Sequence, residues 1–573
     1  MQLQKRFLSL LIVFGFFMLI LAGIFVYIKR DSLRKHFSVV KDELTIVENK
    51  DASGIYHKEN PAAFDTLQNF VHLKLKVNNS RSFRVNKSLW EQIPDSTNIL
   101  LSVEFWGHKY LRKIKNHPLA KINEGAYDKK LQKIYETLFS GDRNIFVRIN
   151  PEMDLPLYQN PWQYSEDYIE SYRHVVSKWQ GKNSKVKFVW GPSGFWGAEE
   201  FYPGDDVVDY MSITIKNETE WLFKRYPPVM DTKNEIHRKM HRLRFFDKPV
   251  MVLANKKWDS RQLVSFCVMS EIDSVAKYRN IAYNDSLWSS AEPITSNSRF
   301  LIGVHDPDQH LVLDAAISVE HIFIDFSQIQ TGELKRLLNE AFSRNHDVIV
   351  TMEPTRAIGG EADTNVLVST IQGKYDTIYR QLFQEITNSE HIVYLRFAHE
   401  MEIPVERYDW QLKDPIDYIR AFRYFMQLPK PFPLNVKKVW GPAGDWGSAD
   451  FYPGDDVVDY ASFAAYGLPD KNITDFKRQV TFEKLAKRKL WRLRLINKPI
   501  FITEFGIKGP EEFQSLWLEN AAKVISENSK IIGASYFNRS DIPGAWGDID
   551  APDWGITINS FHRFVDVLER NCD

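Results

Sequence analysis

The sequence contains few cysteines and no excess of charge of either sign, and both absences narrow its function. Only two cysteines occur in 573 residues, Cys267 and Cys572, and neither belongs to a Cys/His cluster. This excludes a disulfide framework, and neither a metal site nor a cofactor is expected. Lys plus Arg and Asp plus Glu both number 74. A chain without net charge is not expected to bind nucleic acid as its main partner.

One long apolar run is present, at residues 7–28, with no charge and no proline. Its 22 residues are enough to span a bilayer. The run is longer than the apolar region of a signal peptide and lacks a small-residue cleavage site. The sequence therefore predicts an uncleaved, single-pass transmembrane anchor in the lipid bilayer. The basic residues that follow it outnumber those before it, which by itself favours cytoplasmic domains.

An internal duplication organises the rest of the chain. Residues 189–210 and 439–460 are identical at 17 of 22 positions, at an offset of 250. A repeat this long predicts that each copy is a complete domain. Three further pairs of segments match at an offset of 250 or 248: 241–254 with 491–504, 147–156 with 395–404, and 125–139 with 373–386.

Short Val/Ile-rich strands alternate with helical patterns in each copy, and the second copy has eight such strands. Eight strand–helix units in this length are typical of a (β/α)8 barrel. The predicted fold is α/β, with two tandem (β/α)8 TIM barrels at 41–290 and 296–573 after the transmembrane helix. The first copy is less clear at its start, where 43–48 and 70–77 are candidates for its first two strands.

Two predicted strands of the second copy lead to a glutamate. Strand 394–397 is followed shortly by Glu400, and strand 499–504 ends in Glu504. The carboxyl ends of barrel strands share one edge, where active sites form. Two carboxyl groups there are the minimum needed to break a glycosidic bond. The plainer alternative is that each glutamate forms a surface ion pair.

The second copy resembles glycoside hydrolase family 26, the family of β-mannanases and related β-glycanases. The resemblance covers nearly all of 299–562 and depends on the order and spacing of its motifs. The segments that carry it are MEP (352–354), IQGKYD (371–376), RFAHEM (396–401), VWGP (439–442), ITEFG (502–506) and YFN (536–538).

The resemblance implies a retaining hydrolase with Glu400 as acid/base and Glu504 as nucleophile. Tyr466 matches a family tyrosine that orients the nucleophile, and His399 and Arg396 are expected to shape the sugar subsite. The expected substrate is a β-linked polysaccharide, of β-mannan or mixed β-glucan type. Candidate residues for stacking on sugars or for the mouth of the site, each with a structural role as the alternative, are Trp440, Trp446, Trp546, Trp554, Asn538 and Glu353.

Glu402 departs from the family, which usually has asparagine after Glu-Met. An extra carboxylate two residues past the acid/base is expected to alter the sugar preference. Because polymeric glycans are usually met outside the cell membrane, we expect both barrels to be periplasmic or extracellular, against the flanking charges.

The first copy lacks the matching residues. Glu152 aligns with Glu400, but Ala254 replaces the nucleophile, Lys216 replaces Tyr466 and Pro151 replaces His399. Without a carboxylate at 254, the first copy is expected to be degenerate. The whole chain then fits either an anchored glycanase with one working barrel or a non-catalytic glycan-binding or scaffolding protein of polysaccharide assembly or export. The DDVVD segments at 205–209 and 455–459 occur in both copies, and we interpret them as structural acids rather than metal ligands.

Overall fold

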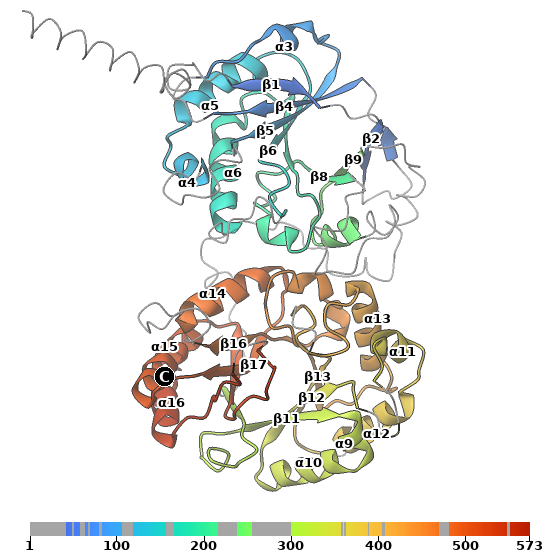
Figure 1. Cartoon of the computed structure of the whole chain (residues 1–573), viewed down its shortest axis with the longest axis vertical. Helices are drawn as coiled ribbons and strands as arrows, with labels where there is room; N and C mark the ends of the chain where they lie inside the picture. Colours follow the sequence, from blue (N-terminus) through green and yellow to red (C-terminus); the bar gives the residue numbers. More distant parts are fainter. Residues whose placement is uncertain are drawn as a thin grey trace, which may run out of the picture.

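Eight parallel strands in the second half of the chain close into a barrel, drawn from yellow-green to red in Figure 1. In this computed structural model the first half is residues 42–254 and the second half residues 300–572. The structure describes both halves apart from gaps at 48–50, 58–63, 67–68, 79–82, 106–117, 156–164, 216–237, 357–358, 360–361, 388, 404–406, 469–480 and 547–549.

The barrel follows the order of the chain, and its last strand pairs again with its first. The sixth strand is divided into two short pieces that both pair with the seventh. All eight strands predicted for this half are confirmed. They are β10 (Leu301–His305), β11 (Val319–Asp325), β12 (Asp347–Glu353), β13 (Val393–Phe397), β14 (Val436–Trp440), β15 (Tyr460–Ala461) with β16 (Ala464–Gly467), β17 (Ile500–Ile507) and β18 (Ile531–Phe537).

Helices cover the outside of this barrel (Figure 1). Each buries one stripe, as Leu334, Leu338 and Ala341 do in α10. Local signals set where they begin: the Asp414 carboxylate accepts the Ile416 N–H at 2.9 Å, just before a proline at the first helical position of α13. The helices are α9 (Phe326–Gln330), α10 (Glu333–Ser343), α11 (Val366–Ile371), α12 (Asp376–Thr387), α13 (Pro415–Met426), α14 (Phe482–Arg492), α15 (Glu511–Ser526) and α16 (Ile558–Cys572).

The interior of the barrel is layered, because alternate residues of each strand point inward. One layer is apolar and contains Val319, Ile349, Tyr394, Val439 and Phe501. Two residues further along β11, β12 and β13 the layer is polar and contains His321, Thr351 and Arg396. Thr351 Oγ1 lies 2.7 Å from His321 Nε2 and accepts from Arg396 at 3.4 Å. This polar layer lies directly beneath the mouth of the barrel.

The described strands of the first half form a curled sheet that does not close, whereas a closed barrel was predicted. Strands β4 to β9 run parallel, but β1 pairs antiparallel with β4, and β2 pairs antiparallel with β9. The strands are β1 (Glu43–Ile46), β2 (Asp51–Tyr56), β3 (Phe64–Thr66), β4 (Phe70–Lys76), β5 (Asn98–Glu104), β6 (Ile145–Ile149), β7 (Val186–Trp190), β8 (Tyr210–Ile215) and β9 (Val250–Ala254). The helices are α3 (Ser88–Gln92), α4 (Pro118–Asn123), α5 (Asp128–Ile134) and α6 (Ser165–Trp179).

The open sheet corrects the prediction for 43–48. That segment does form a strand, β1, but it runs against its neighbour instead of starting a parallel barrel. The alternation of apolar and polar residues that predicts a strand is the same in both directions, so it carries no information on strand direction.

The predicted anchor at 7–28 and the stretch between the two predicted barrels, 291–295, lie outside the described residues. Within 42–254 and 300–572, apart from the gaps given above, no helix is long and apolar enough to cross a bilayer.

Candidate active site

Glu504 lies in β17, and both oxygens of its carboxylate are held. Oε1 accepts a hydrogen bond from Arg396 Nη1 of β13 at 2.5 Å, and Oε2 accepts one from the Tyr466 hydroxyl of β16 at 2.9 Å. Glu504 is 5% exposed and Arg396 is fully buried. Side chains from two other strands of the barrel, β13 and β16, therefore fix the orientation of this carboxylate.

Glu400 lies in the turn after β13, and its backbone is in the left-handed region with φ of 51°. Its N–H donates to the Gly441 carbonyl at 2.9 Å. Glu152, the aligned residue of the first half, has φ of 63° and donates to the Gly191 carbonyl at 2.7 Å. Because both halves keep this backbone, the strained conformation belongs to the shared turn and is not by itself a sign of catalysis.

The two glutamates interact electrostatically. Burial, and next the negative charge of Glu504, raise the pKa of the Glu400 carboxyl to about 8, while the Arg396 guanidinium opposes the rise. At neutral pH Glu400 is therefore mainly protonated. One carboxyl that holds a proton beside one that is clamped by a cation is the arrangement that acid and nucleophile roles require.

His399 and Glu353 lie on the β12–β13 side of the mouth. Burial, followed by Arg396 and Arg407, holds the pKa of His399 well below its usual range, so the imidazole is neutral. Its ring packs 5.4 Å from the Tyr408 ring, and the Tyr408 hydroxyl donates to Glu353 Oε1 at 2.7 Å. Burial raises the pKa of Glu353.

Two of the four predicted sugar platforms occupy positions that do not suit stacking on a ligand. Trp440 is fully buried in β14 and packs against Tyr452 with ring centroids 5.0 Å apart. Trp446 lies against the first half, where its carbonyl accepts from Trp196 Nε1 at 2.5 Å. A side chain on Gly197 would collide with the Trp446 ring. Trp440 is therefore a core residue, and Trp446 belongs to the contact between the halves.

The other two tryptophans lie beside Tyr466. Trp554 is fully buried, and its ring lies 4.7 Å from the Tyr466 ring, so it supports the tyrosine from behind. Trp546 is partly exposed, lies 5.7 Å from Tyr466, and donates from Nε1 to Asp541 at 2.8 Å. Among the four predicted platforms, Trp546 has the position that best suits contact with a sugar.

Asn538 is 4% exposed, and both ends of its amide make contacts within the protein. Nδ2 donates to Asp306 at 2.9 Å, and Oδ1 accepts from the Ile556 N–H at 3.0 Å. Asn538 therefore braces the loop beyond β18, which favours its structural role over substrate binding.

Glu402 does not have the position expected of a residue that alters sugar preference. It is 2% exposed, and its Oε1 accepts the N–H groups of Gly444 and Asp445 at 2.9 and 3.0 Å. The aligned Asp154 accepts the N–H groups of Ser193 and Phe195 in the first half. A carboxylate at this position organises the loop after β14 in the second half and the loop after β7 in the first half.

Three groups around the site were not predicted from the sequence. His321 and Thr351 lie in the polar layer under Arg396, and Asp541 joins Trp546 to Arg407, whose Nη1 lies 3.7 Å from Asp541. The internal repeat contained a signal for His321 and Thr351. His72 and Ser102 of the first half form the same contact at 2.8 Å, so the pair could have been found from the repeat.

The first half keeps part of this polar layer without the nucleophile. Arg148 is buried at the position of Arg396, and Ala254 ends β9 where β17 carries Glu504. Burial lowers the pKa of Arg148, and Glu152 and Glu104 oppose that shift. Pro151 is buried, and Lys216 lies outside the described residues.

The DDVVD acids make structural contacts in both halves. Arg173 binds Asp206 through two hydrogen bonds of 2.8 and 2.7 Å, and Arg423 binds Asp456 at the same two distances. Asp459 accepts the Lys438 N–H of the neighbouring strand at 2.8 Å. These contacts support the interpretation that the acids hold the connection between the fifth and sixth strands.

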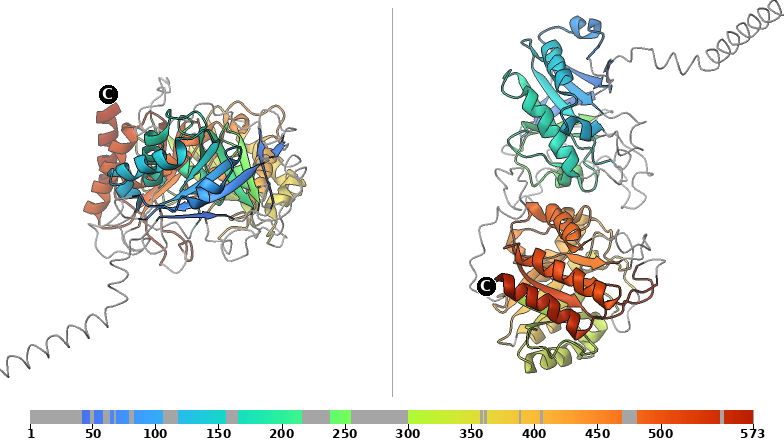
Figure 2. Two further views of the ribbon diagram at one scale, coloured as in Figure 1. Left: turned by 90° about the horizontal axis from the view of Figure 1, so that it is seen from above. Right: turned by 90° about the vertical axis from the view of Figure 1, so that its left-hand side faces the viewer.

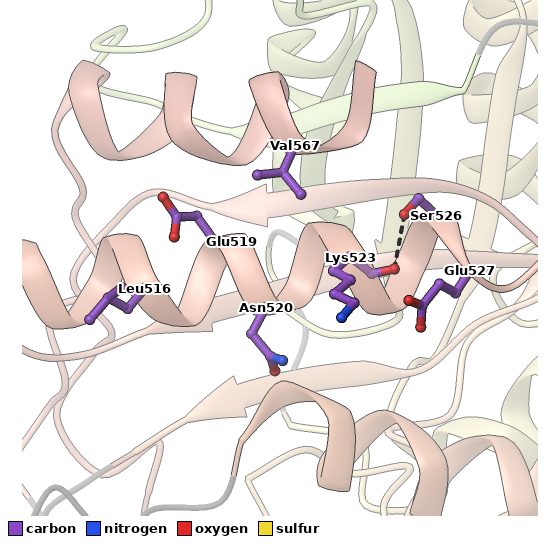
Figure 3. Close-up of a pocket in the computed structure, with 7 residues that line it drawn as sticks. All are labelled: Leu516, Glu519, Asn520, Lys523, Ser526, Glu527 and Val567. Atoms are coloured by element: carbon purple, nitrogen blue, oxygen red, sulfur yellow. Dashed lines mark hydrogen bonds between the residues drawn. The ribbon is translucent and has the colours of Figure 1, made fainter. Parts of the chain in front are cut away.

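A surface depression elsewhere on the second half lies on α15 and α16, which run side by side on its outer face (Figure 2). Figure 3 shows its lining, which is mixed in charge and includes Glu519, Lys523 and Glu527. None of the residues of the candidate active site contributes to it. The depression is therefore separate from Glu400 and Glu504.

Comparison with known proteins gives partial matches, and no family model matches the chain. Endoglucanase H of Acetivibrio thermocellus is 26% identical over 294 residues, 49% of this chain and 31% of that protein. A β-1,3-xylanase of Alcaligenes sp is 26% identical over 180 residues, 30% of this chain and 34% of that protein. The chain thus spans about a third of the length of these curated relatives.

Among solved structures, GH26C from Muricauda sp. MAR_2010_75 aligns over 47% of this chain and 85% of that chain, at 15% identity and a TM-score of 0.35. Similarity at this level does not bear on activity. The barrel assignment therefore depends on the strand pairing described above.

Proposed function

We propose that the second half is a retaining β-glycanase similar to glycoside hydrolase family 26, acting on O-glycosidic bonds of a β-linked polysaccharide. The observation that carries the proposal is the clamped Glu504 carboxylate at the mouth of one barrel, whose negative charge, together with burial, raises the pKa of Glu400. The similarity to an endoglucanase and a β-1,3-xylanase supports the same class.

The chemistry proceeds in two steps. Glu504 attacks the anomeric carbon while Glu400 donates its proton to the departing glycosidic oxygen. Glu400, now ionised, then takes a proton from water, which attacks the same carbon and releases Glu504 with the original configuration restored. Arg396 and Tyr466 hold the Glu504 oxygens throughout, which aligns the nucleophile before the substrate arrives.

The test is product analysis of the full-length protein on β-mannan, mixed-linkage β-glucan, β-1,4-xylan and β-1,3-xylan. Proton NMR of the first products reports the anomeric configuration. We expect one polymer to yield β-configured oligosaccharides. An initial α product would contradict the retaining mechanism, and no cleavage of any glycan would contradict the proposal.

We expect kcat/KM on the polymer to fall as pH rises through about 8, because the proton that Glu400 donates is lost above its raised pKa. Below that pH Glu400 holds its proton, so its titration causes no further change in kcat/KM there. The measurement is kcat/KM over roughly pH 5 to 10, with a circular dichroism spectrum at each pH to show that the fold persists. A fall that is centred well below pH 7 would assign the donor to another group.

A second candidate function, glycan binding without catalysis, is favoured for the first half by Ala254 at the position of the nucleophile.

From residues 7–28 we further propose that the chain is membrane-anchored with both halves outside the cytoplasm. A phosphatase fused after residue 40 is then expected to be active, and an inactive fusion would reverse the orientation.

A further inference from the structure

The two halves contact each other through the repeated loops in a reciprocal way. Trp446 lies over Gly197 of the first half, and Trp196 lies over Gly447 of the second. A Cβ atom on either glycine would come within 2 Å of the opposing indole nitrogen, at 1.5 and 1.9 Å. The contact therefore has approximate two-fold symmetry, as between two copies of one surface.

The ion pairs across this contact are reciprocal too. Arg492 Nε of α14 lies 3.0 Å from Glu200 Oε1 of the first half, and Arg242 Nε of the first half lies 2.8 Å from Asp450 Oδ2. These are the same two positions of the repeat, exchanged between the halves. In Figure 1, α14 lies on the side of the barrel that faces the first half.

On the second half's side, α14 holds the loop 441–447. Lys489 Nζ donates to the Ala443 carbonyl at 2.7 Å, and Arg492 Nη1 donates to the Gly444 carbonyl at 3.2 Å. Both cations also lie near Asp445, at 3.3 and 3.5 Å. The Arg492 guanidinium therefore contacts both Glu200 of the first half and the loop 441–447.

The opposite side of the same loop supports Glu400. The Gly441 carbonyl accepts the Glu400 N–H at 2.9 Å, and Glu402 accepts two N–H groups of the loop. A Cβ atom at 441 would lie 2.1 Å from Arg396 Nε, so the loop also packs directly on the cation that holds Glu504. A continuous set of contacts thus leads from Glu200 of the first half to the acid/base of the second.

We propose that the first half is a positioning module for the second, and that Glu200 is a positioning residue that acts on Glu400 through Arg492 and the loop 441–447. The proposal rests on the proposed function of the second half. The mirror contact, Arg242 with Asp450, is the equivalent ion pair, there with a hydrogen bond, and it leads to the loop of the half without a nucleophile. There Arg242 Nη1 donates to the Gly194 carbonyl.

The test compares Glu200→Gln with the mirror variant Asp450→Asn in the full-length protein. A displacement of the acid/base by a fraction of an ångström lowers kcat by about tenfold. We expect that loss for Glu200→Gln with KM nearly unchanged, and about wild-type kcat for Asp450→Asn. A loosened loop also admits water to Glu400, so the high-pH limb of Glu200→Gln is expected to move to lower pH.

Hydrogen exchange provides a readout that does not require turnover. We expect faster amide exchange over 441–447 in Glu200→Gln and over 191–197 in Asp450→Asn. The milder variant Glu200→Asp keeps the negative charge on a side chain one methylene shorter. It replaces Glu200→Gln in the test if the glutamine variant does not fold. We expect a smaller increase in amide exchange over 441–447 for Glu200→Asp.

Unchanged exchange over 441–447 in a folded Glu200 variant, or equal losses of kcat in both mirror variants, would overturn the positioning role. A wild-type protein that cleaves none of the glycans would contradict the proposed activity instead. In that case the exchange measurement still decides whether Glu200 holds the loop.

Discussion

Glu504→Ala is expected to abolish turnover, with a loss of about 10⁴-fold or more in kcat. Without the carboxylate no covalent glycosyl-enzyme forms, and the described neighbours of residue 504 offer a guanidinium and a phenol, neither of which replaces it. The measurement is kcat on one aryl glycoside and on the polymer that the full-length protein cleaves.

Loss of folding is a separate effect of the same substitution and needs its own control. Arg396 is fully buried, and removing its partner costs about 3–5 kcal/mol of the free energy of unfolding. Glu504→Gln keeps an amide oxygen that accepts from Arg396, and its NH2 group can donate to the Tyr466 hydroxyl, but it is not a nucleophile. We expect it to be as inactive as the alanine variant and closer to wild type in thermal unfolding.

Glu152→Ala in the first half is the matched control for the site. Glu152 has the same turn and the same N–H contact as Glu400, but the strand that would carry its partner ends in Ala254. We expect wild-type turnover. Substantial activity in both Glu504 variants, or a collapse in folded Glu152→Ala, would place the chemistry in the first half.

The sequence was sufficient to predict the second barrel, because its eight strands are short, rich in β-branched residues and separated by amphipathic helices. It also placed Glu400 and Glu504 on two strand ends, which the closed order of the barrel brings to one mouth. The repeat supported the prediction of separate domains, and the family resemblance supported the roles of the two glutamates, since a single strand ending in glutamate is uninformative.

The roles of the tryptophans and of Glu402 could not be predicted in the same way. The Trp446 ring lies over Gly197, a residue 249 positions earlier, and no local pattern encodes such a contact. Glu402 is adjacent to the acid/base in sequence, yet its carboxylate faces the backbone of the loop 441–447. Its pKa is raised to about 7, chiefly by burial, and its charge adds to the field that keeps Glu400 protonated.

The resemblance between the halves extends over only part of the first half. Matching segments at a constant offset predicted a second complete barrel, but the segments that match lie in β5 to β9 and their connections. The strands that close the sheet in the second half have no counterpart there among the described residues. Antiparallel strands β1 and β2 occupy the two sides of the parallel set instead.

Glu400→Ala is expected to separate the two steps of the reaction. An aryl glycoside with a good leaving group departs without a proton, so its kcat/KM should change little. The polymer needs the proton, and its kcat/KM should fall by about 10²–10⁴-fold. Because Glu400 also activates water in the second step, kcat on the aryl glycoside should fall as the glycosyl-enzyme accumulates.

Azide tests this assignment directly. It is a nucleophile that needs no base, and the space left by the Glu400 side chain lies beside the buried Glu504. Added azide is expected to raise kcat of Glu400→Ala on the aryl glycoside and to give a β-glycosyl azide, while leaving the wild type unchanged. An α-glycosyl azide would show that azide attacks the substrate itself, with Glu504 not acting as nucleophile. Equal losses on both substrates without rescue would mean that Glu400 supports the site only structurally. The proton donor would then have to be sought in Glu353, a partly buried carboxyl at this mouth whose pKa is raised by burial.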